Sequence, residues 1–311
     1  MAKNPFDLKY REVIGRILEN GKLCHTRSGS TLALIDEVSL SHDLADGFPL
    51  LTTRRLPWKG IRVELDGFLK GITNKQWYLD RGCHFWDAWA RRDVVNATLA
   101  GIDQSNMTPE ERVELQNKVQ LEELDIFSGY FWELLHFGAE YLGHDADYTG
   151  KGLNQIEWAL ERLRTIPNCR EVVMLGWNPT NFKKYAIPPC YYSWQVQVID
   201  GRLCMNYAQR SADMAMGAPN DFALNAIFLV LMANSLGVRP GKLTVNYGNA
   251  HVYTNHVENM KELIAREPFA PPRLELSTDI NINNFEWELA ELSGYEYHGK
   301  LDFAKNIGEN T

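Results

Sequence analysis

Residues 222–236 are the most apolar part of the chain and constrain its fold more strongly than any other feature. Asn225 and Asn234 interrupt the stretch, which is also shorter than the ~20 residues that a membrane-spanning helix needs. A helix that is apolar on most sides is instead buried in the core of a large protein. We therefore expect a buried helix here.

Length and charge narrow the class of protein. The 311 residues are enough for one large domain or two small ones, and we treat residues 1–311 as one domain. The net charge of −8 argues against a general nucleic-acid-binding protein, although arginines gathered in one pocket could still bind a small anion. The N-terminus has no apolar run typical of a secretory signal, and no membrane partner is expected.

The cysteines indicate a reducing compartment, so we expect a cytoplasmic protein. Their number is odd, and they show neither a CxxC pair nor a short secreted framework. The same pattern signals no metal site, and no metal is expected. The five positions are Cys24, Cys83, Cys169, Cys190 and Cys204.

Apolar periodicity predicts a mixture of helices and strands. Without a regular βαβ rhythm, the mixture favours an α+β fold over a doubly wound α/β fold. The expected helices are 6–20, 61–69 and 153–163; the expected strands are 31–40, 172–175 (short and buried) and 243–247; and a hairpin joins 194–198 to 203–207 through Asp200 and Gly201.

Residues 91–124 differ in character from the rest of the chain. They are rich in Glu, Gln, Asn and Asp, and Thr108 and Glu111 have the spacing of a helix capping box. We interpret the segment as a helical surface insertion, not a separate domain.

Cys190 is the cysteine with a candidate chemical role. It follows Pro188 and Pro189 and precedes a strand, so its backbone is fixed at an element boundary. A buried structural thiol is the commoner fate of a lone cysteine. A nucleophile needs a nearby cation that favours the thiolate, and Arg210 qualifies if the hairpin folds back beside Cys190. From spacing alone, a buried structural thiol is the favoured interpretation of Cys190.

Dispersed motifs reverse that order. They are Arg27 with Ser28 and Gly29; residues 48–55; Glu64, Phe68, Leu69, Gly71, Thr73 and Asn74; Trp86, Asp87 and Trp89; Pro189 and Cys190; Gln209, Arg210, Ser211 and Asp213; Gly217 and Pro219; and residues 248–256. They cover nearly the whole chain, and together and in this order they resemble the thymidylate synthase family.

The resemblance implies a fold, an activity and residue roles. The fold would be thymidylate synthase-like, with helices packed on a mixed sheet and a homodimer formed through that sheet. Cys190 would attack C6 of a pyrimidine nucleotide so that C5 takes a one-carbon unit from 5,10-methylenetetrahydrofolate. Glu64 would order water and move protons, and Tyr130 matches an active-site tyrosine across a loose alignment. The implied nucleotide ligands are Arg27, Gln209, Arg210, Ser211, His251, Tyr253 and Arg170 of the partner subunit; those of folate are Trp86, Asp213 and Gly217.

Asp221 departs from the family at the residue that reads the base, which is usually Asn. A carboxamide complements the N3–H donor and O4 acceptor of uracil. Cytosine presents an N3 acceptor and an amino donor, which a protonated carboxyl matches; an ionised carboxylate could pair with N3-protonated cytosine. Asp221 could also be only the N-cap of the following helix. The change resembles the deoxycytidylate hydroxymethylases, a branch of the family known from bacteriophages that modify their DNA.

Other departures lie near the implied site. Tyr191 replaces a histidine expected near C4 of the base, and Glu171 replaces a second cross-subunit arginine. Asn220 is more polar than usual where folate would pack. Residues 305–311 lack the short apolar C-terminus that closes over folate in the family. An intermediate open to water is what hydroxymethylation requires.

The expected reaction is therefore conversion of dCMP and methylenetetrahydrofolate to 5-hydroxymethyl-dCMP and tetrahydrofolate. Within the same enzyme class, the alternatives are C5-methylation of dCMP or dUMP with release of dihydrofolate, and hydroxymethylation of CMP or dUMP. A non-catalytic nucleotide-binding protein is a further alternative, although binding alone needs no nucleophile. A hydrolase built on Cys190 and His251 is less consistent with the sequence.

Overall fold

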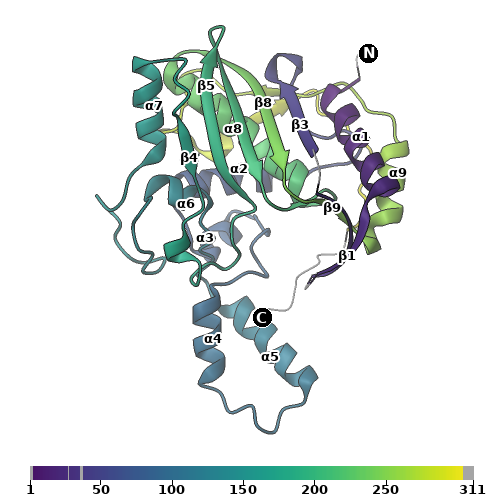
Figure 1. Cartoon of the computed structure of the whole chain (residues 1–311), viewed down its shortest axis with the longest axis vertical. Helices are drawn as coiled ribbons and strands as arrows, with labels where there is room; N and C mark the ends of the chain where they lie inside the picture. The colour runs from purple at the N-terminus through teal and green to yellow at the C-terminus, as the bar shows by residue number, and fades with distance from the viewer. Residues whose placement is uncertain (1–2, 27, 36–37, 304–311) are drawn as a thin grey trace.

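A 20-residue helix, α8 (Gly217–Leu236), forms the centre of the fold (Figure 1). The computed structural model describes residues 3–26, 28–35 and 38–303. The two asparagines that interrupt the apolar stretch of α8 are paired: Asn225 Oδ1 accepts from Trp194 Nε1 at 2.6 Å, and Asn234 Nδ2 donates to the Ile280 carbonyl at 2.7 Å. The predicted buried helix is confirmed, and it begins at Gly217, earlier than expected.

A five-stranded mixed sheet packs against α8. Its order is β3-β8-β6-β5-β4, with β6 and β8 parallel and the other pairs antiparallel. Mixed strand directions with helices on one side agree with the expected class of fold. The bounds are β3 (Val38–Asp43), β4 (Val173–Leu175), β5 (Tyr191–Ile199), β6 (Arg202–Gln209) and β8 (Arg239–Tyr247).

The hairpin β5–β6 confirms the turn predicted at Asp200 and Gly201. Their φ angles are 54° and 70°, so both residues adopt the left-handed conformation of the two-residue turn that matches strand twist. The short strand β4 is less buried than expected, because Met174 is buried while Val173 and Leu175 are exposed. It lies at the edge of the sheet, where one side has no neighbouring strand.

The prediction of a single strand over residues 31–40 is wrong, because the chain passes there from one sheet to another. β2 (Gly29–Leu34) belongs to a four-stranded sheet and β3 to the five-stranded one. The four-stranded sheet has the order β1-β2-β9-β7, with bounds β1 (Lys22–Thr26), β7 (Ala212–Asp213) and β9 (Ala250–Tyr253). It carries Asp213 and His251, so the change of sheet shapes one side of the candidate site.

The remaining helices surround this core. α1 and α2 include the helices predicted at 6–20 and 61–69, and α7 overlaps the one predicted at 153–163 but begins and ends two residues later. α2 packs against both α8 and α6. The helices are α1 (Pro5–Asn20), α2 (Trp58–Leu69), α3 (Lys75–Asp80), α6 (Tyr130–Leu135), α7 (Gln155–Thr165) and α9 (Val257–Ala265); short 3₁₀ turns lie at Leu44–Asp46, Pro179–Asn181, Thr254–His256 and Trp287–Leu289; and β10 (Arg273–Glu275) pairs with β11 (Glu291–Ser293).

Two helices form an arm that projects from the body (Figure 1). They are α4 (Arg92–Ala100) and α5 (Pro109–Glu122), within the segment expected to be helical. Thr108 and Glu111 form the capping box that the sequence predicts. That residues 91–124 are an insertion in a single domain stays a prediction.

Candidate active site

The hairpin brings Arg210 beside Cys190. Cys190 immediately precedes β5, Arg210 immediately follows β6, and the Arg210 amide donates to the Cys190 carbonyl at 2.8 Å. The guanidinium turns back along the same segment and donates to the carbonyls of Pro188 at 2.6 Å and Pro189 at 3.0 Å. The cation that a nucleophilic Cys190 requires is thus in place.

The thiol of Cys190 is nevertheless protonated in this state. Burial raises its pKa above the ordinary value; the positive charge of Arg210 opposes this shift and the Asp221 carboxylate adds to it. Arg210 therefore lowers the pKa of Cys190, as expected, but not enough to make the thiol a thiolate. Burial outweighs the effect of Arg210 on the pKa of Cys190 in this state.

Tyr130 holds the backbone of Cys190. Its hydroxyl accepts from the Cys190 amide at 2.8 Å, and its ring lies 4.6 Å from that of Tyr191 and 5.6 Å from that of Phe68, between centroids. Tyr130 has φ 43°, a left-handed conformation that a bulky residue adopts only when its surroundings enforce it. Such strain at a residue touching Cys190 agrees with a functional position.

Glu64 and Trp86 form a buried pair. Trp86 Nε1 donates to Glu64 Oε1 at 2.9 Å. Burial, with a smaller contribution from the Asp221 carboxylate, raises the pKa of Glu64 to about 8. Glu64 is therefore mostly neutral at pH 7, and a carboxyl whose pKa lies near the working pH is suited to take up and release protons.

Asp221 is oriented by Gln209. Gln209 Nε2 donates to Asp221 Oδ2 at 2.8 Å and to the Ser211 carbonyl at 3.0 Å. Burial, aided by the charge of Asp213, raises the pKa of Asp221 to about 7, although the bond from Gln209 opposes the shift. Met216 occupies the N-cap position of α8, so Asp221 lies inside the helix and the N-cap reading is wrong.

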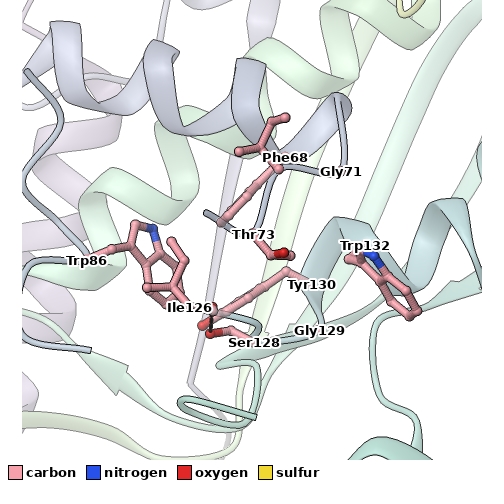
Figure 2. A pocket seen from close by; sticks show the side chains of 10 residues that line it. Phe68, Gly71, Thr73, Trp86, Ile126, Ser128, Gly129, Tyr130 and Trp132 are labelled. Carbon is pink, nitrogen blue, oxygen red and sulfur yellow. Dashed lines mark hydrogen bonds between the residues drawn. The ribbon is translucent and has the colours of Figure 1, made fainter. Parts of the chain in front are cut away.

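A small hollow opens beside Trp86 and Tyr130 (Figure 2). Phe68 adds a third aromatic ring to its wall. Flat aromatic walls suit a flat heteroaromatic ring such as that of a folate. Asp213 and Gly217, the other two residues implied for folate, are not part of this wall.

His251 faces Asp213 across the four-stranded sheet. The two residues are register partners in β9 and β7, and His251 Nδ1 lies 2.9 Å from Asn249 Oδ1. Burial lowers the pKa of His251, and the opposing charge of Asp213 does not offset it. Neutral His251 then carries its proton on Nδ1, and Nε2 is left as an acceptor for a hydroxyl. Tyr253 packs edge-on at 5.4 Å between ring centroids.

The whole sequence is similar to that of known proteins. The family model described as thymidylate synthase matches residues 8–307, nearly the whole chain. The chain belongs to the thymidylate synthase family.

Individual members of the family resemble the chain at moderate identity. It is 32% identical to human thymidylate synthase over 293 residues, covering 94% of this chain and 88% of the relative. It is 33% identical to thymidylate synthase 1/2 of Encephalitozoon cuniculi, covering 93% and 94%. It is 34% identical to the bifunctional dihydrofolate reductase-thymidylate synthase of Leishmania major, of which it spans 54%. These relatives are thymidylate synthases, so they do not single out the deoxycytidylate branch.

The other two implied phosphate ligands are Arg27 and Arg170. Arg27 lies outside the described residues, as do residues 305–311. Arg170 is exposed before β4, and its carbonyl accepts from Gln195 Nε2 at 3.3 Å. Gln195 is five residues along β5 from Cys190, a spacing of roughly 16 Å along the strand. Nearby Glu171 pairs with Arg162 at 2.8 Å.

The structure also shows residues that the sequence reading missed. Tyr207 and Tyr247 are buried on the same sheet face as Gln209, and Asn249 orients His251. Side chains alternate along β6, so the sequence predicts that Tyr207 lies on the same face as Gln209. The register between β6 and β8, which brings Tyr247 to that face, cannot be predicted from local sequence. Across the described ranges, no cluster of His, Cys, Asp and Glu could hold a metal ion, and no helix is long and apolar enough to cross a membrane.

Proposed function

We propose that this protein transfers a one-carbon unit from 5,10-methylenetetrahydrofolate to C5 of a pyrimidine nucleoside monophosphate. Membership in the thymidylate synthase family supports this class of reaction. The arrangement of Cys190, Arg210 and Glu64 supports catalysis over simple binding, because a buried thiol beside a cation and a near-neutral carboxyl has no role in binding alone.

Each group would have a distinct task. Cys190 adds to C6, which makes C5 a carbon nucleophile, and leaves again when the product forms. Arg210 binds the 5′-phosphate through its forked N–H donors, and His251 with Tyr253 holds the sugar hydroxyl. The folate supplies the one-carbon unit, and Trp86 with Phe68 would stack on its ring. Glu64 holds water and passes protons near C4 and C5 of the base.

The base is the finer part of the proposal, and the observation that carries it is the Gln209–Asp221 contact. Gln209 donates to Oδ2, so a neutral Asp221 carries its proton on Oδ1. The carboxyl then offers one donor and one acceptor to the base. With Oδ1 placed toward N3 of the base, this order complements N3 and the amino group of cytosine, and it leaves an unmatched pair against uracil. We therefore propose dCMP as substrate.

The product has two candidates. The relatives are thymidylate synthases, and they favour transfer of a methyl group with release of dihydrofolate. Asp221 favours a cytosine substrate, which fits hydroxymethylation, in which water adds to the one-carbon unit after transfer and tetrahydrofolate is released. We place 5-hydroxymethyl-dCMP first on the substrate argument, with C5-methylation of dCMP or dUMP as the second candidate.

A homodimer completes the proposed site. The face of the five-stranded sheet opposite α8, turned toward the viewer in Figure 1, is not covered by any helix of the described residues. Gln195 and Asn206 on this face are polar and partly or fully accessible. A second copy seated there would bring exposed Arg170 to the phosphate bound by its neighbour.

One experiment separates these reactions. The protein is incubated with dCMP, CMP or dUMP, each with methylenetetrahydrofolate, and the nucleotide is analysed by mass spectrometry. We expect dCMP to gain a hydroxymethyl group without dihydrofolate absorbance. Stoichiometric release of dihydrofolate would show that the reaction is methylation and not hydroxymethylation. Release of tritium from 5-tritiated dCMP tests covalent activation, and its absence would exclude catalysis at C5.

A further inference from the structure

Two buried tyrosines stand behind Gln209. Tyr207 precedes Gln209 by two residues on β6, and Tyr247 is the register partner of Gln209 on β8. Strand alternation therefore places all three side chains on the sheet face that α8 covers. Their exposed fractions are 1% for Tyr207 and Gln209 and 5% for Tyr247.

Each of these side chains has a polar atom that the protein does not satisfy. The hydroxyl oxygens of Tyr207 and Tyr247 and the Oε1 of Gln209 are buried, with no hydrogen-bond partner among the described residues. Burial chiefly, and then neighbouring groups that include Asp221, raise the pKa of both phenols, so both lie close to that carboxyl. Buried polar groups of this kind are normally satisfied by ordered water.

We propose that Tyr207, Tyr247 and Gln209 Oε1 bind a buried water that fixes the Gln209 amide and thereby the base preference of Asp221. This inference deepens the proposed function and rests on it. Two phenols and one amide oxygen supply both donors and acceptors, which is what a structural water with two to four partners requires. The tyrosines are positioning residues, because they act on the base through Gln209 and Asp221.

The orientation of Gln209 decides which base Asp221 can accept. With Nε2 toward Asp221, Oδ2 must accept and the carboxyl proton lies on Oδ1. If the amide rotated by half a turn, Oε1 would accept the carboxyl proton from Oδ2. The other oxygen would then be an acceptor only, which suits the N3–H of uracil.

One interaction sets the orientation of the amide, and a second holds the side chain in place. The Ser211 carbonyl accepts from Nε2 at 3.0 Å, and rotation would set Oε1 against this carbonyl, so that two acceptors would face each other. The bound water, which can donate or accept, holds the other end of the amide at Oε1. Removing the phenols removes the water's partners, and the amide is then held at the Ser211 end only and can rotate more freely.

The test is a Tyr207→Phe/Tyr247→Phe double variant. Dissociation constants for dCMP and dUMP are measured by calorimetry without folate, so that catalysis is not required. We expect the preference for dCMP over dUMP to fall about tenfold, the size of one misdirected hydrogen bond. The single Tyr247→Phe variant should shift the preference in the same direction by less, and it serves if the double variant does not fold.

Tyr141→Phe is the control. Its hydroxyl is also buried, but it contacts Thr73 and Asp125 in a cluster separate from Gln209. It should lower the melting temperature and leave the dCMP preference intact. A Tyr141→Phe variant that loses the preference equally would overturn the specific role of Tyr207 and Tyr247.

The outcomes separate this inference from the proposed function. A wild-type protein that binds dUMP as tightly as dCMP removes the proposed substrate, and this inference with it. If the dCMP preference of the double variant stays within twofold of the wild type, the proposed role of the water is overturned and the proposed substrate still stands. A high-resolution crystal structure should show a water within hydrogen-bonding distance of Gln209 Oε1 and one phenol; an empty site there would also overturn it.

Discussion

Asp221 and Glu64 are two buried carboxyls that face the same site and lie close enough for the charge of one to act on the other. Each has a pKa raised by burial, to about 7 for Asp221 and about 8 for Glu64, and the charge of Asp221 contributes to the shift of Glu64. Near pH 7 the pair therefore holds at least one proton. A site in this state can donate a hydrogen bond to a base and still exchange a proton with it.

Asp221→Asn tests base recognition. We expect the ratio of kcat/KM for dCMP to kcat/KM for dUMP to fall by ~10–100-fold, because an amide complements uracil and leaves one unmatched pair with cytosine. Steady-state kinetics with both nucleotides measures this ratio. Inhibition by inorganic phosphate is the control and should not change, since Arg210 is untouched. An unchanged ratio would remove the basis for dCMP.

Glu64→Gln tests the protonation of the buried pair. Glu64 has a higher pKa folded than unfolded, so the folded state binds the extra proton between pH 4.5 and about 8. Its contribution to stability is complete below pH 4.5 and is lost as the pH rises through about 8. The wild type should lose a few kcal/mol across this window, and Glu64→Gln less. Denaturant unfolding at several pH values measures both; parallel curves would contradict the shift.

At the scale of elements, Lys75 links the arm to the segment that carries Trp86. It is 2% exposed, and its ammonium donates to the carbonyls of Asp87 and Trp89 at 3.2 Å and of Gln120 at 3.0 Å. Gln120 on α5 in turn donates to the Ala88 carbonyl. The arm is therefore tied to the segment that follows Trp86, whose ring forms part of the aromatic wall in Figure 2.

Lys75→Met tests this link. Met fills a similar volume but leaves three carbonyls without their donor, so we expect a loss of ~1–3 kcal/mol in the free energy of unfolding. The KM for methylenetetrahydrofolate should rise more than that for the nucleotide, because Trp86 lies in the released segment. Lys118→Met, at an exposed position of α5, is the control and should change neither. Equal rises in both KM values would argue against a link to the folate side.

The elements also show where local patterns suffice. Asp200 and Gly201 define the β5–β6 turn by their own conformational preferences, and Thr108 caps α5 through Glu111 three residues away. The apolar pattern of residues 31–40 is continuous, so it predicts one strand. β2 and β3 separate there because each pairs with a different distant partner, β9 and β8, which local pattern cannot reveal.

At the scale of the whole molecule, the proposed dimer accounts for the position of Arg170. Its carbonyl is bound to Gln195, five residues along β5 from Cys190 of the same subunit, and its side chain is exposed. The uncovered sheet face offers the surface through which a second copy would bring it to a phosphate.

Mixed subunits test this arrangement. Cys190→Ala and Arg170→Ala are each expected to be inactive as homodimers. Mixing after reversible dissociation should restore about a quarter of wild-type activity, because half of the dimers are mixed and each of these has one intact site. Activity assays before and after mixing measure the recovery. A mixture that stays inactive although mixed dimers form, as checked by tagged pull-down, would place Arg170 outside the site.

The sequence by itself determined the class of fold, the buried helix, the hairpin and the family resemblance, because these depend on periodicity, turn chemistry and motif order within the chain. It also singled out Asp221 as the unusual residue. Only the tertiary structure decided that Cys190 is protonated beside Arg210, that Asp221 lies within α8 and that Gln209 orients its carboxyl. Those properties depend on burial and hydrogen bonds between segments far apart in sequence, and desolvation is set by the packing of every element around the site.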